Sequence, residues 1–303
     1  MNNGLKHYGT VVPMVTPVTA NGGLDEAALE RLIEALLAGG VDGIFVLGTT
    51  GEGVHVPKPL RERLVQRSAA IVKRRALVYA GLLDIHPGEF RVANDYFRAG
   101  ADAVVVHPPI SKPVPAAELH VWYRSLLDQL EGPLILYNMP STTGVSIPLD
   151  AVEKLLGHPR LAGIKDSEND WKRLEELLNR FGSRPGFSIF IGVGAHMAKG
   201  LKMGAHGIVP SVGNLIPEVC HGLIASARRG DWAEADNYFS RMSDVSALYQ
   251  KGRTLSESLS VLKAAVHCRG LCEPHVLPPL LPISAKEIEK LRAQMYQLRL
   301  NGR

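Results

Sequence analysis

Cysteine is scarce in this sequence: there are three among 303 residues, Cys220, Cys268 and Cys272. Their spacing matches no metal-binding or redox motif, so the sequence offers neither a zinc site nor a disulfide framework. An odd and scattered set of thiols fits a reducing compartment. We therefore expect a cytoplasmic protein without a cysteine-based metal site.

Long apolar runs and strong charge of one sign are also missing. The longest apolar runs have the length of a strand, as at residues 103–106, far below the roughly 20 residues of a membrane-spanning helix. The 34 basic and 30 acidic residues give a net charge of +4. No run of five or six like charges accompanies it, so we expect neither a membrane nor a nucleic acid as partner.

Apolar, β-branched runs alternate with amphipathic stretches up to about residue 229. Helical periods occur between these runs, for example at 26–37, 61–72, 89–98, 116–130 and 171–181. Such alternation predicts parallel βα units, and runs this apolar fit strands that are buried on both faces. The eight expected strands are 10–15, 43–47, 76–82, 103–107, 134–138, 161–165, 188–192 and 207–212.

A short pattern recurs three times, at residues 40–44, 100–104 and 204–208. Each copy ends a helix with a glycine, which tolerates the left-handed conformation, and then enters a strand. The separations, 60 and 104 residues, correspond to two and four βα units of roughly 25–30 residues each. The copies would therefore begin strands 2, 4 and 8. An open, doubly wound sheet also alternates, but eight units favour a closed (β/α)8 TIM barrel.

The strand pattern stops after residue 230. Residues 231–248, 255–267 and 284–298 are predicted to be helices, and Ser284 is the expected N-cap of the last one. A proline-rich stretch at 274–282 forms a stiff connection between them. The sequence thus predicts a catalytic barrel over residues 1–229 and a helical domain of three helices over residues 230–303.

The expected strand 2 runs into Gly48-Thr49-Thr50-Gly51-Glu52. In (β/α)8 enzymes the active site lies at the C-terminal ends of the strands. Glycines allow the backbone to approach a ligand, and two hydroxyls with exposed N–H groups can hold a carboxylate. The segment lacks the Gly-x4-Gly-Lys-Ser/Thr pattern of a phosphate-binding loop. A tight turn with helix-capping threonines would give the same pattern.

Two further side chains stand at strand ends. Tyr137 is near the end of expected strand 5, where its phenol either relays protons or simply closes the barrel. Lys165 ends expected strand 6, and lysine is seldom buried without a role. Burial would favour the neutral amine, a nucleophile that forms Schiff bases with carbonyl substrates. Alternatively, the lysine extends past the strand end to solvent.

Taken together, these segments resemble the dihydrodipicolinate synthase / N-acetylneuraminate lyase family over essentially the whole chain. The resemblance extends to the late segment Val276-Leu277-Pro278-Pro279 before the last helix. The other matching segments are Gly48-Thr49-Thr50-Gly51-Glu52, Tyr137-Asn138-Met139-Pro140 with Gly144, Gly163-Ile164-Lys165-Asp166, and Gly204-Ala205-His206-Gly207.

The resemblance implies a role for each site residue. Lys165 would form the Schiff base with the keto carbon of pyruvate, and Tyr137 would move protons during imine formation and during carbon–carbon bond making or breaking. Thr49 and Thr50 would bind the carboxylate, with Gly48 beside them, and Thr49 would also orient Tyr137. Further pocket residues would be Gly192 and Val209. The resemblance implies no metal or organic cofactor, and a homotetramer or homodimer.

Two departures from the family bear on the second substrate. True dihydrodipicolinate synthases carry an arginine two residues before the glycine of the strand-5 motif, where this chain has Thr142. They also carry a tyrosine pair after strand 4, where this chain has Pro109 and Ile110. The loss of a bidentate carboxylate partner argues against synthase activity. Thr142 is then expected to contact a different second substrate.

The segment after expected strand 7 is small and mostly apolar, Gly192-Val193-Gly194-Ala195-His196. N-acetylneuraminate lyases and sugar-acid aldolases have acidic residues there for a polyhydroxy tail, so this chain is more similar to the hydroxy-oxoglutarate aldolase branch. We expect a class I lyase that forms or cleaves a 4-hydroxy-2-keto acid, with pyruvate and an aldehyde as partners. The alternatives are a dihydrodipicolinate synthase, a keto-deoxy-sugar-acid dehydratase, or a non-catalytic regulator that binds a keto acid.

Overall fold

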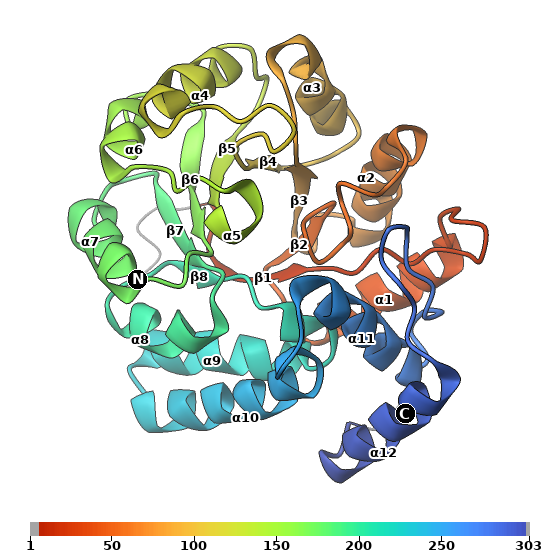
Figure 1. The fold of residues 1–303 in the computed structure, drawn as a ribbon. Coiled ribbons are helices and arrows are strands. Elements are labelled where there is room, and N and C mark those ends of the chain that lie inside the picture. Colours follow the sequence, from red (N-terminus) through yellow and green to blue (C-terminus); the bar gives the residue numbers. More distant parts are fainter. Residues whose placement is uncertain (1–5, 301–303) are drawn as a thin grey trace.

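The computed structural model describes residues 6–300 and shows a closed barrel of eight parallel strands in chain order (Figure 1). The expected (β/α)8 TIM barrel is thereby confirmed. Each strand pairs with the next, and β8 closes the barrel against β1. The strands are β1 Gly9–Pro13, β2 Gly43–Val46, β3 Leu77–Leu82, β4 Ala103–Val106, β5 Leu134–Asn138, β6 Leu161–Asp166, β7 Ser188–Ile191 and β8 Gly207–Ile208.

Helices surround the barrel and continue past it. Their starts follow local chemistry: Asp25 caps α1 by accepting a hydrogen bond from the Ala28 N–H, and Asp170 caps α7 in the same way. The helices are α1 Glu26–Ala38, α2 Lys58–Val72, α3 Arg91–Arg98, α4 Leu119–Leu127, α5 Pro140–Thr143, α6 Leu149–Leu155, α7 Trp171–Phe181, α8 Met197–Lys202, α9 Pro217–Arg229, α10 Trp232–Gln250, α11 Leu255–Cys268 and α12 Ala285–Gln297.

The three glycines of the recurring pattern end helices and precede strands, as predicted. Gly40, Gly100 and Gly204 adopt φ values of 79°, 104° and 96°, in the left-handed region that glycine enters at little cost. Strands β2, β4 and β8 begin three residues after these glycines. The internal repeat therefore marks genuine helix-to-strand junctions.

The expectation for the last strand was wrong. The expected strand 207–212 ends at Ile208, and Ser211–Asn214 wind into a 3₁₀ turn. Pro210 has no N–H to donate to a neighbouring strand, so the ladder cannot continue through it. The helix expected at 116–130 is also shorter, because a 3₁₀ turn precedes α4 and the chain leaves the helix after Leu127.

Alternate residues along each strand point into the barrel. These inward side chains form a packed cluster of their own, separate from the larger core between the strands and the surrounding helices. The barrel is therefore filled below its mouth rather than hollow. The inward cluster comprises Val11, Phe45, Tyr79, Leu83, Ala103, Val105, Ile135, Tyr137, Phe190 and Val209.

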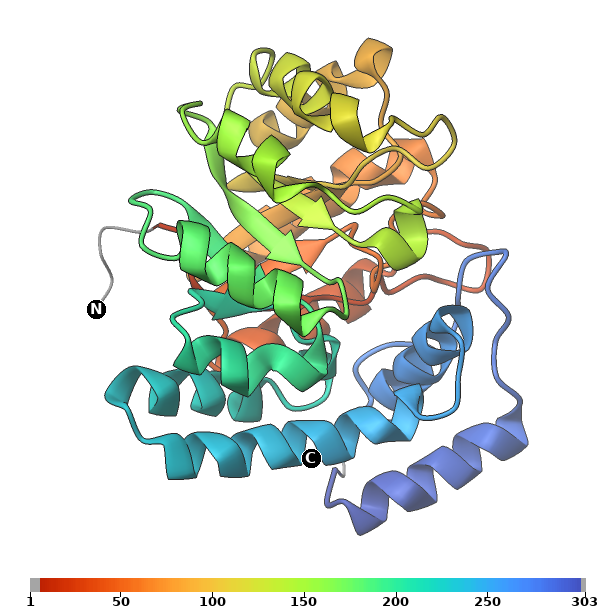
Figure 2. The ribbon, with the colours of Figure 1, turned by 60° about the vertical axis from the view of Figure 1, so that its left-hand side comes forward.

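The last three helices lie to one side of the barrel, with α10 running alongside α9 (Figure 2). Ser284 forms a complete capping box with Glu287 at the start of α12, as expected. Gly230, with φ of 74°, separates α9 from α10 at the expected domain boundary; the division itself stays a prediction. In residues 6–300 no helix is both long and apolar enough to span a membrane.

Candidate active site

Lys165 and Tyr137 lie side by side at the ends of β6 and β5, where the two residues are partners in the strand register. The Lys165 amine sits 3.8 Å from the centre of the Tyr137 ring and 5.1 Å from that of Phe45. Lys165 is only 6% exposed. The lysine thus turns into the barrel and does not extend to bulk solvent. A buried amine beside a phenol is an arrangement suited to attack on a carbonyl group.

Thr49 joins this pair through the Tyr137 hydroxyl, which lies 3.2 Å from the Thr49 hydroxyl. Two loops from different strands thereby meet over the lysine. The Met139 sulfur accepts a hydrogen bond from Tyr137 at 2.7 Å and lies 3.6 Å from the Thr49 hydroxyl. Met139 entered the sequence analysis only as part of a motif, and its contact with both hydroxyls comes from the sharp turn into α5.

The loop that carries Thr49 and Thr50 is tightly wound. Leu47 and Glu52 on either side adopt left-handed φ values of 58° and 57°, which is strained for residues with a side chain. A Cβ on Gly53 would lie 1.9 Å from the Leu47 carbonyl oxygen, so only glycine fits there. In the described part of the chain, the N–H groups of Thr49 and Thr50 have no protein acceptor.

Glu52 anchors this loop to the C-terminal helices. Its carboxylate forms an ion pair with Lys263 of α11, and both side chains are 1% exposed. Its other oxygen accepts a hydrogen bond from the Leu277 N–H at 2.6 Å. The loop that bears the two threonines is therefore fixed by residues more than 200 positions away in the sequence. Sequence reasoning did not foresee this ion pair, because no local pattern joins its partners.

A polar network fixes the ends of β5 and β6. The Asn138 amide donates to Asp166 at 3.0 Å and to Glu168 at 2.9 Å. Arg173 of α7 reaches the same two carboxylates at 3.0 and 3.1 Å. Burial raises the pKa of Asp166, and the Arg173 charge opposes that rise. Asn138 follows Tyr137 and Asp166 follows Lys165 in the chain, so the hydrogen bond between Asn138 and Asp166 holds the two site residues in their relative positions.

The remaining predicted site residues surround this centre at different depths. Gly48 packs against the Phe45 ring, since a Cβ there would lie 2.7 Å from a ring carbon. Val209 lies inside the barrel next to Lys165 in a small apolar hollow.

The Thr142 hydroxyl on α5 is buried, and no described residue is its hydrogen-bond partner. Gly192 follows β7, and a Cβ there would lie 2.0 Å from the Ser167 hydroxyl, so a side chain at this position would displace that hydroxyl.

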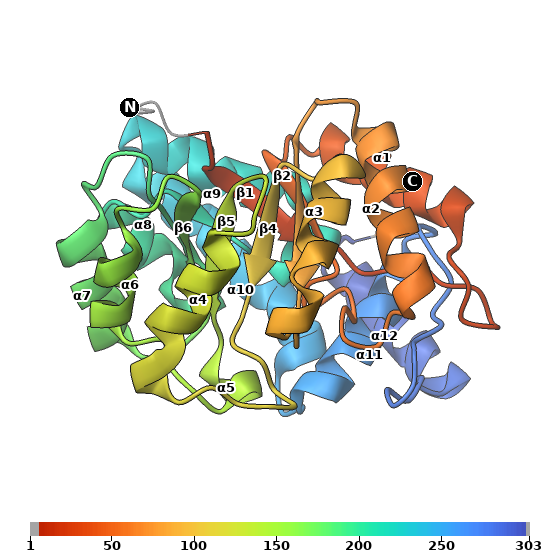
Figure 3. The ribbon, with the colours of Figure 1, turned by 90° about the horizontal axis from the view of Figure 1, so that it is seen from above.

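A cavity of about 370 Å³ separates the ends of β7 and β8 from α10. Its barrel wall includes Gly192, Gly194 and Ala195, and its helix wall includes Ser246 and Lys251. Figure 3 shows α5 at the end of the barrel to which the strand arrows point. Since Gly192 directly follows β7, this cavity opens at that end as well, where it could receive the distal part of a substrate.

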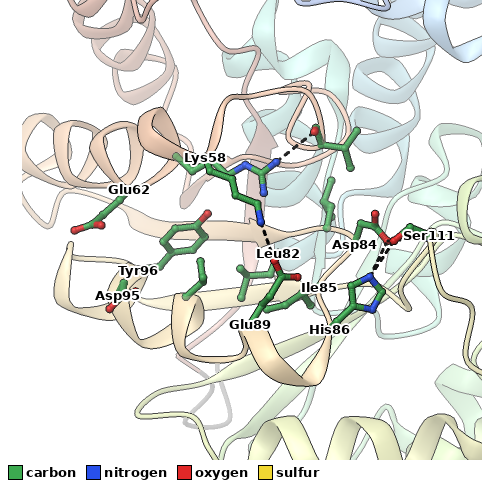
Figure 4. A pocket seen from close by; sticks show the side chains of 14 residues that line it. Lys58, Glu62, Leu82, Asp84, Ile85, His86, Glu89, Asp95, Tyr96 and Ser111 are labelled. Atoms are coloured by element: carbon green, nitrogen blue, oxygen red, sulfur yellow. Dashed lines mark hydrogen bonds and ion pairs between the residues drawn. The ribbon is translucent and has the colours of Figure 1, made fainter.

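A second hollow, of about 420 Å³, lies between α2, the end of β3 and α3 (Figure 4). An ion pair crosses it: Lys58 pairs with Glu89 at 2.8 Å and lowers the pKa of that carboxyl. Burial disfavours ionisation of Asp84, but hydrogen bonds from Ser111 and Ile110 outweigh it and lower its pKa. Neither hollow is lined by Lys165, Tyr137 or Thr49. We locate the chemistry at the barrel axis because these three residues meet there.

Comparisons with known proteins agree with this geometry. The profile of the Dihydrodipicolinate synthetase family matches residues 6–298. YagE of Escherichia coli K12, provisionally named a 2-dehydro-3-deoxy-D-gluconate aldolase, is 30% identical over 297 residues, 96% of this chain and 97% of YagE. A 4-hydroxy-tetrahydrodipicolinate synthase of Anaeromyxobacter sp. strain Fw109-5 is also 30% identical, over 96% of this chain and 97% of the synthase. The crystal structure of YagE with pyruvate superposes with a TM-score of 0.90 at 29% identity, covering 97% and 99% of the two chains.

Proposed function

The chain belongs to the dihydrodipicolinate synthetase family, and we propose that it is a class I lyase that forms or cleaves a 4-hydroxy-2-keto acid, with pyruvate as the keto-acid partner. The observation that carries the proposal is the buried Lys165 amine beside Tyr137, whose hydroxyl is bonded to Thr49. A lysine, a phenol and a hydroxyl in contact supply the nucleophile and the proton relay that imine chemistry needs.

The reaction follows from these positions. The Lys165 amine adds to the keto carbon, and loss of water from the adduct gives an iminium ion. Tyr137 is adjacent to the amine and can move the protons that this dehydration requires. When the bond between C3 and C4 breaks, the iminium accepts its electron pair and the aldehyde leaves. Water then releases pyruvate from the lysine. The iminium is itself the electron sink, so the cleavage needs no separate one. A base must still take the C4 hydroxyl proton, and C3 must gain a proton before water releases pyruvate.

The strained loop after β2 offers hydrogen-bond donors that would bind the keto-acid carboxylate. The N–H groups of Thr49 and Thr50 have no acceptor within residues 6–300, and a carboxylate is the acceptor that such paired donors favour. The Glu52 anchor holds these donors in place before the substrate arrives. Preorganised donors of this kind hold the substrate with its keto carbon facing the amine.

Sequence identity does not select the second substrate, because the aldolase and synthase relatives are equally similar to this chain. The residues in the site favour an aldolase that acts on a 4-hydroxy-2-keto acid over a dihydrodipicolinate synthase. Thr142 offers a hydroxyl where the synthases have an arginine, and the Ile110 N–H is already bound to Asp84 at 2.7 Å. Among residues 6–300, no acidic side chain for a polyol tail lines the cavity beside Gly194 and Ala195, and polar groups such as Ser246 and Lys251 come from the helix wall.

A synthase remains the second candidate, favoured by the name of the Anaeromyxobacter relative, and a keto-deoxy-sugar-acid dehydratase is the third. A charged substrate carboxylate without its guanidinium partner loses about 1.5–3 kcal/mol, or roughly 10–150-fold in affinity. We therefore expect little dihydrodipicolinate from pyruvate and aspartate semialdehyde. Efficient condensation of these two compounds, or complementation of a diaminopimelate auxotroph, would reassign the substrate without changing the Lys165 chemistry.

Reduction with borohydride in the presence of pyruvate tests the mechanism directly. The reduced imine should appear by peptide mass mapping on Lys165 alone, and the Lys165→Ala variant should remain unlabelled. A coupled lactate dehydrogenase assay should then detect pyruvate release from at least one compound in a panel of 4-hydroxy-2-keto acids. Label on another residue, or none at all, would refute the Schiff base and favour a non-catalytic regulator.

We also propose a cytoplasmic location and assembly into a homotetramer or homodimer. Thiols without a disulfide support the first proposal: Cys220, Cys268 and Cys272 are all free. The family resemblance supports the second. Light scattering of the purified protein measures the number of subunits, and a monomer at micromolar concentration would refute the assembly.

A further inference from the structure

His107 directly follows β4 and takes part in none of the motifs that suggested the function. Its side chain is fully buried. Ala103 and Val105 of the same strand belong to the cluster inside the barrel, and residues two positions apart point to the same face. His107 therefore directs its ring into the barrel, at the end where Tyr137 and Lys165 lie.

The ring is close to the catalytic pair and its orientation is fixed. The centres of the His107 and Tyr137 rings are 5.9 Å apart. The Nδ1 atom lies 2.6 Å from the Pro108 carbonyl oxygen. A carbonyl oxygen can only accept, so Nδ1 carries the proton and Nε2 presents a free lone pair.

The lone pair of His107 has nothing to bind in the protein. Its Nε2 atom is buried, and no donor among residues 6–300 reaches it. Buried acceptors are nearly always paired, so the missing donor is expected to come from a bound molecule. Burial lowers the pKa of His107, and the Lys165 charge lowers it further, against the opposite effect of Asp84. The imidazole is therefore neutral, and able to accept a proton, at neutral pH.

We propose that His107 is the catalytic base that takes the C4 hydroxyl proton of the substrate held on Lys165. This inference rests on the proposed function. Pyruvate has no hydroxyl on its methyl carbon, so only the larger 4-hydroxy-2-keto acid supplies the missing donor. His107 would then share the proton transfers of carbon–carbon bond cleavage with Tyr137, while Tyr137 alone would act as the imine forms.

The step balances in atoms and charge. The proton moves from the C4 oxygen to Nε2, the C4–O bond becomes a carbonyl, and the electron pair of the C3–C4 bond moves into the iminium. The nitrogen on Lys165 loses its positive charge as His107 gains one, so the net charge of the buried site does not change. After the aldehyde leaves, the imidazolium returns its proton to C3. The enamine thereby becomes the iminium of pyruvate, ready for hydrolysis.

The test compares two variants with the wild-type enzyme. His107→Gln keeps an amide near the Nε2 position, and His107→Asn keeps one near Nδ1, but neither can accept a proton. We expect kcat for cleavage to fall by about 10²–10⁴-fold in both, with KM changed by no more than a few fold. Borohydride trapping of pyruvate on Lys165 should stay within about twofold of the wild-type rate, because pyruvate does not engage His107.

A pH profile separates a base from a residue that only supports the structure. Wild-type kcat should decline on the acidic side with a pKa below the usual 6.5 of histidine, because protonated His107 has no lone pair. The Gln variant should lose that decline. Full activity in His107→Gln, equal loss of trapping and cleavage, or a wild-type profile with no acidic decline over the range in which the enzyme stays folded would each overturn the assignment. Should His107→Gln fail to fold, the wild-type profile decides. Absence of trapping in the wild type would instead refute the proposed function.

Discussion

Lys165 and Lys263 are both buried, but the groups around their amines differ. Lys263 of α11 is paired with the Glu52 carboxylate, which also accepts from the Leu277 N–H. Lys165 at the end of β6 has the Tyr137 and Phe45 rings as neighbours, and no carboxylate of a described residue forms an ion pair with it. The two lysines therefore differ in their partners rather than in their burial.

The difference separates a structural role from a chemical one. A buried ion pair holds its amine in the protonated state and orients both partners, which suits an anchor for the carboxylate loop. The Lys165 amine lies over aromatic rings and is not held in an ion pair, so it is available to a carbonyl carbon. Burial of a lysine is thus a signal of function only when the surroundings do not neutralise its charge.

The largest expected effect comes from removing the unpaired amine. Lys165→Met should abolish turnover, because the amine that forms the imine is gone, while the midpoint of thermal unfolding stays the same or rises slightly. Methionine fills a similar volume and removes a buried polar amine that has no carboxylate partner. Pyruvate release and calorimetry on one preparation measure both properties. Residual turnover above about one thousandth of wild type would contradict the role of Lys165.

Tyr137→Phe tests the neighbour of the same amine. The ring remains to pack against Phe45 and Lys165, but the ionisable hydroxyl is lost. General acid–base help contributes roughly 10²–10⁴-fold, so kcat should fall by that range with the unfolding midpoint nearly unchanged. An unaltered rate would remove Tyr137 from the mechanism and leave it as a packing residue.

The paired lysine should respond in the opposite way. Lys263→Met leaves the Glu52 carboxylate buried without its counterion, and the free energy of unfolding should fall by about 3–5 kcal/mol. Adding Glu52→Gln to the same protein should recover much of that loss. Chemical denaturation of both variants, with Lys165→Met as the matched control, measures the difference. Equal stability of Lys263→Met and Lys165→Met would erase the distinction between the two regions.

The smallest expected effect concerns Thr49, which connects the two regions. Thr49→Val keeps the shape but removes the hydroxyl bonded to Tyr137. One hydrogen bond contributes about 0.5–1.5 kcal/mol, so kcat/KM for the keto acid should fall by up to roughly tenfold. Thr19→Val, in a turn far from the site in sequence, is the control and should leave kcat/KM unchanged.

The sequence predicted the barrel because its patterns are local. Apolar runs, helix-ending glycines and the Ser284 cap each depend on a few neighbouring residues, and all appear in the structure. The error at β8 had a local cause as well: apolar Val209 and Val212 extended the pattern across Pro210, which cannot join a strand ladder. Greater weight on that proline would have shortened the strand.

The candidate site could be predicted only in part. Lys165 and Tyr137 end strands that are neighbours in the barrel, so their proximity follows once closure is assumed. Alternation along β4 also contained a signal for His107, since positions 103, 105 and 107 share a face. No sequence pattern predicted that the Met139 sulfur would contact the hydroxyls of Tyr137 and Thr49, because that contact depends on the turn into α5.

By itself the sequence determined which residues end strands, and therefore which side chains gather at the catalytic end of the barrel. The tertiary structure alone decided which buried charge has a partner. Glu52 and Lys263 are 211 residues apart, and they meet only because α11 folds back over the loop after β2. Whether a side chain is buried or paired depends on residues that are distant in the sequence. Folding placed two aromatic rings and no carboxylate beside the Lys165 amine, and these neighbours decide which chemistry the amine can perform.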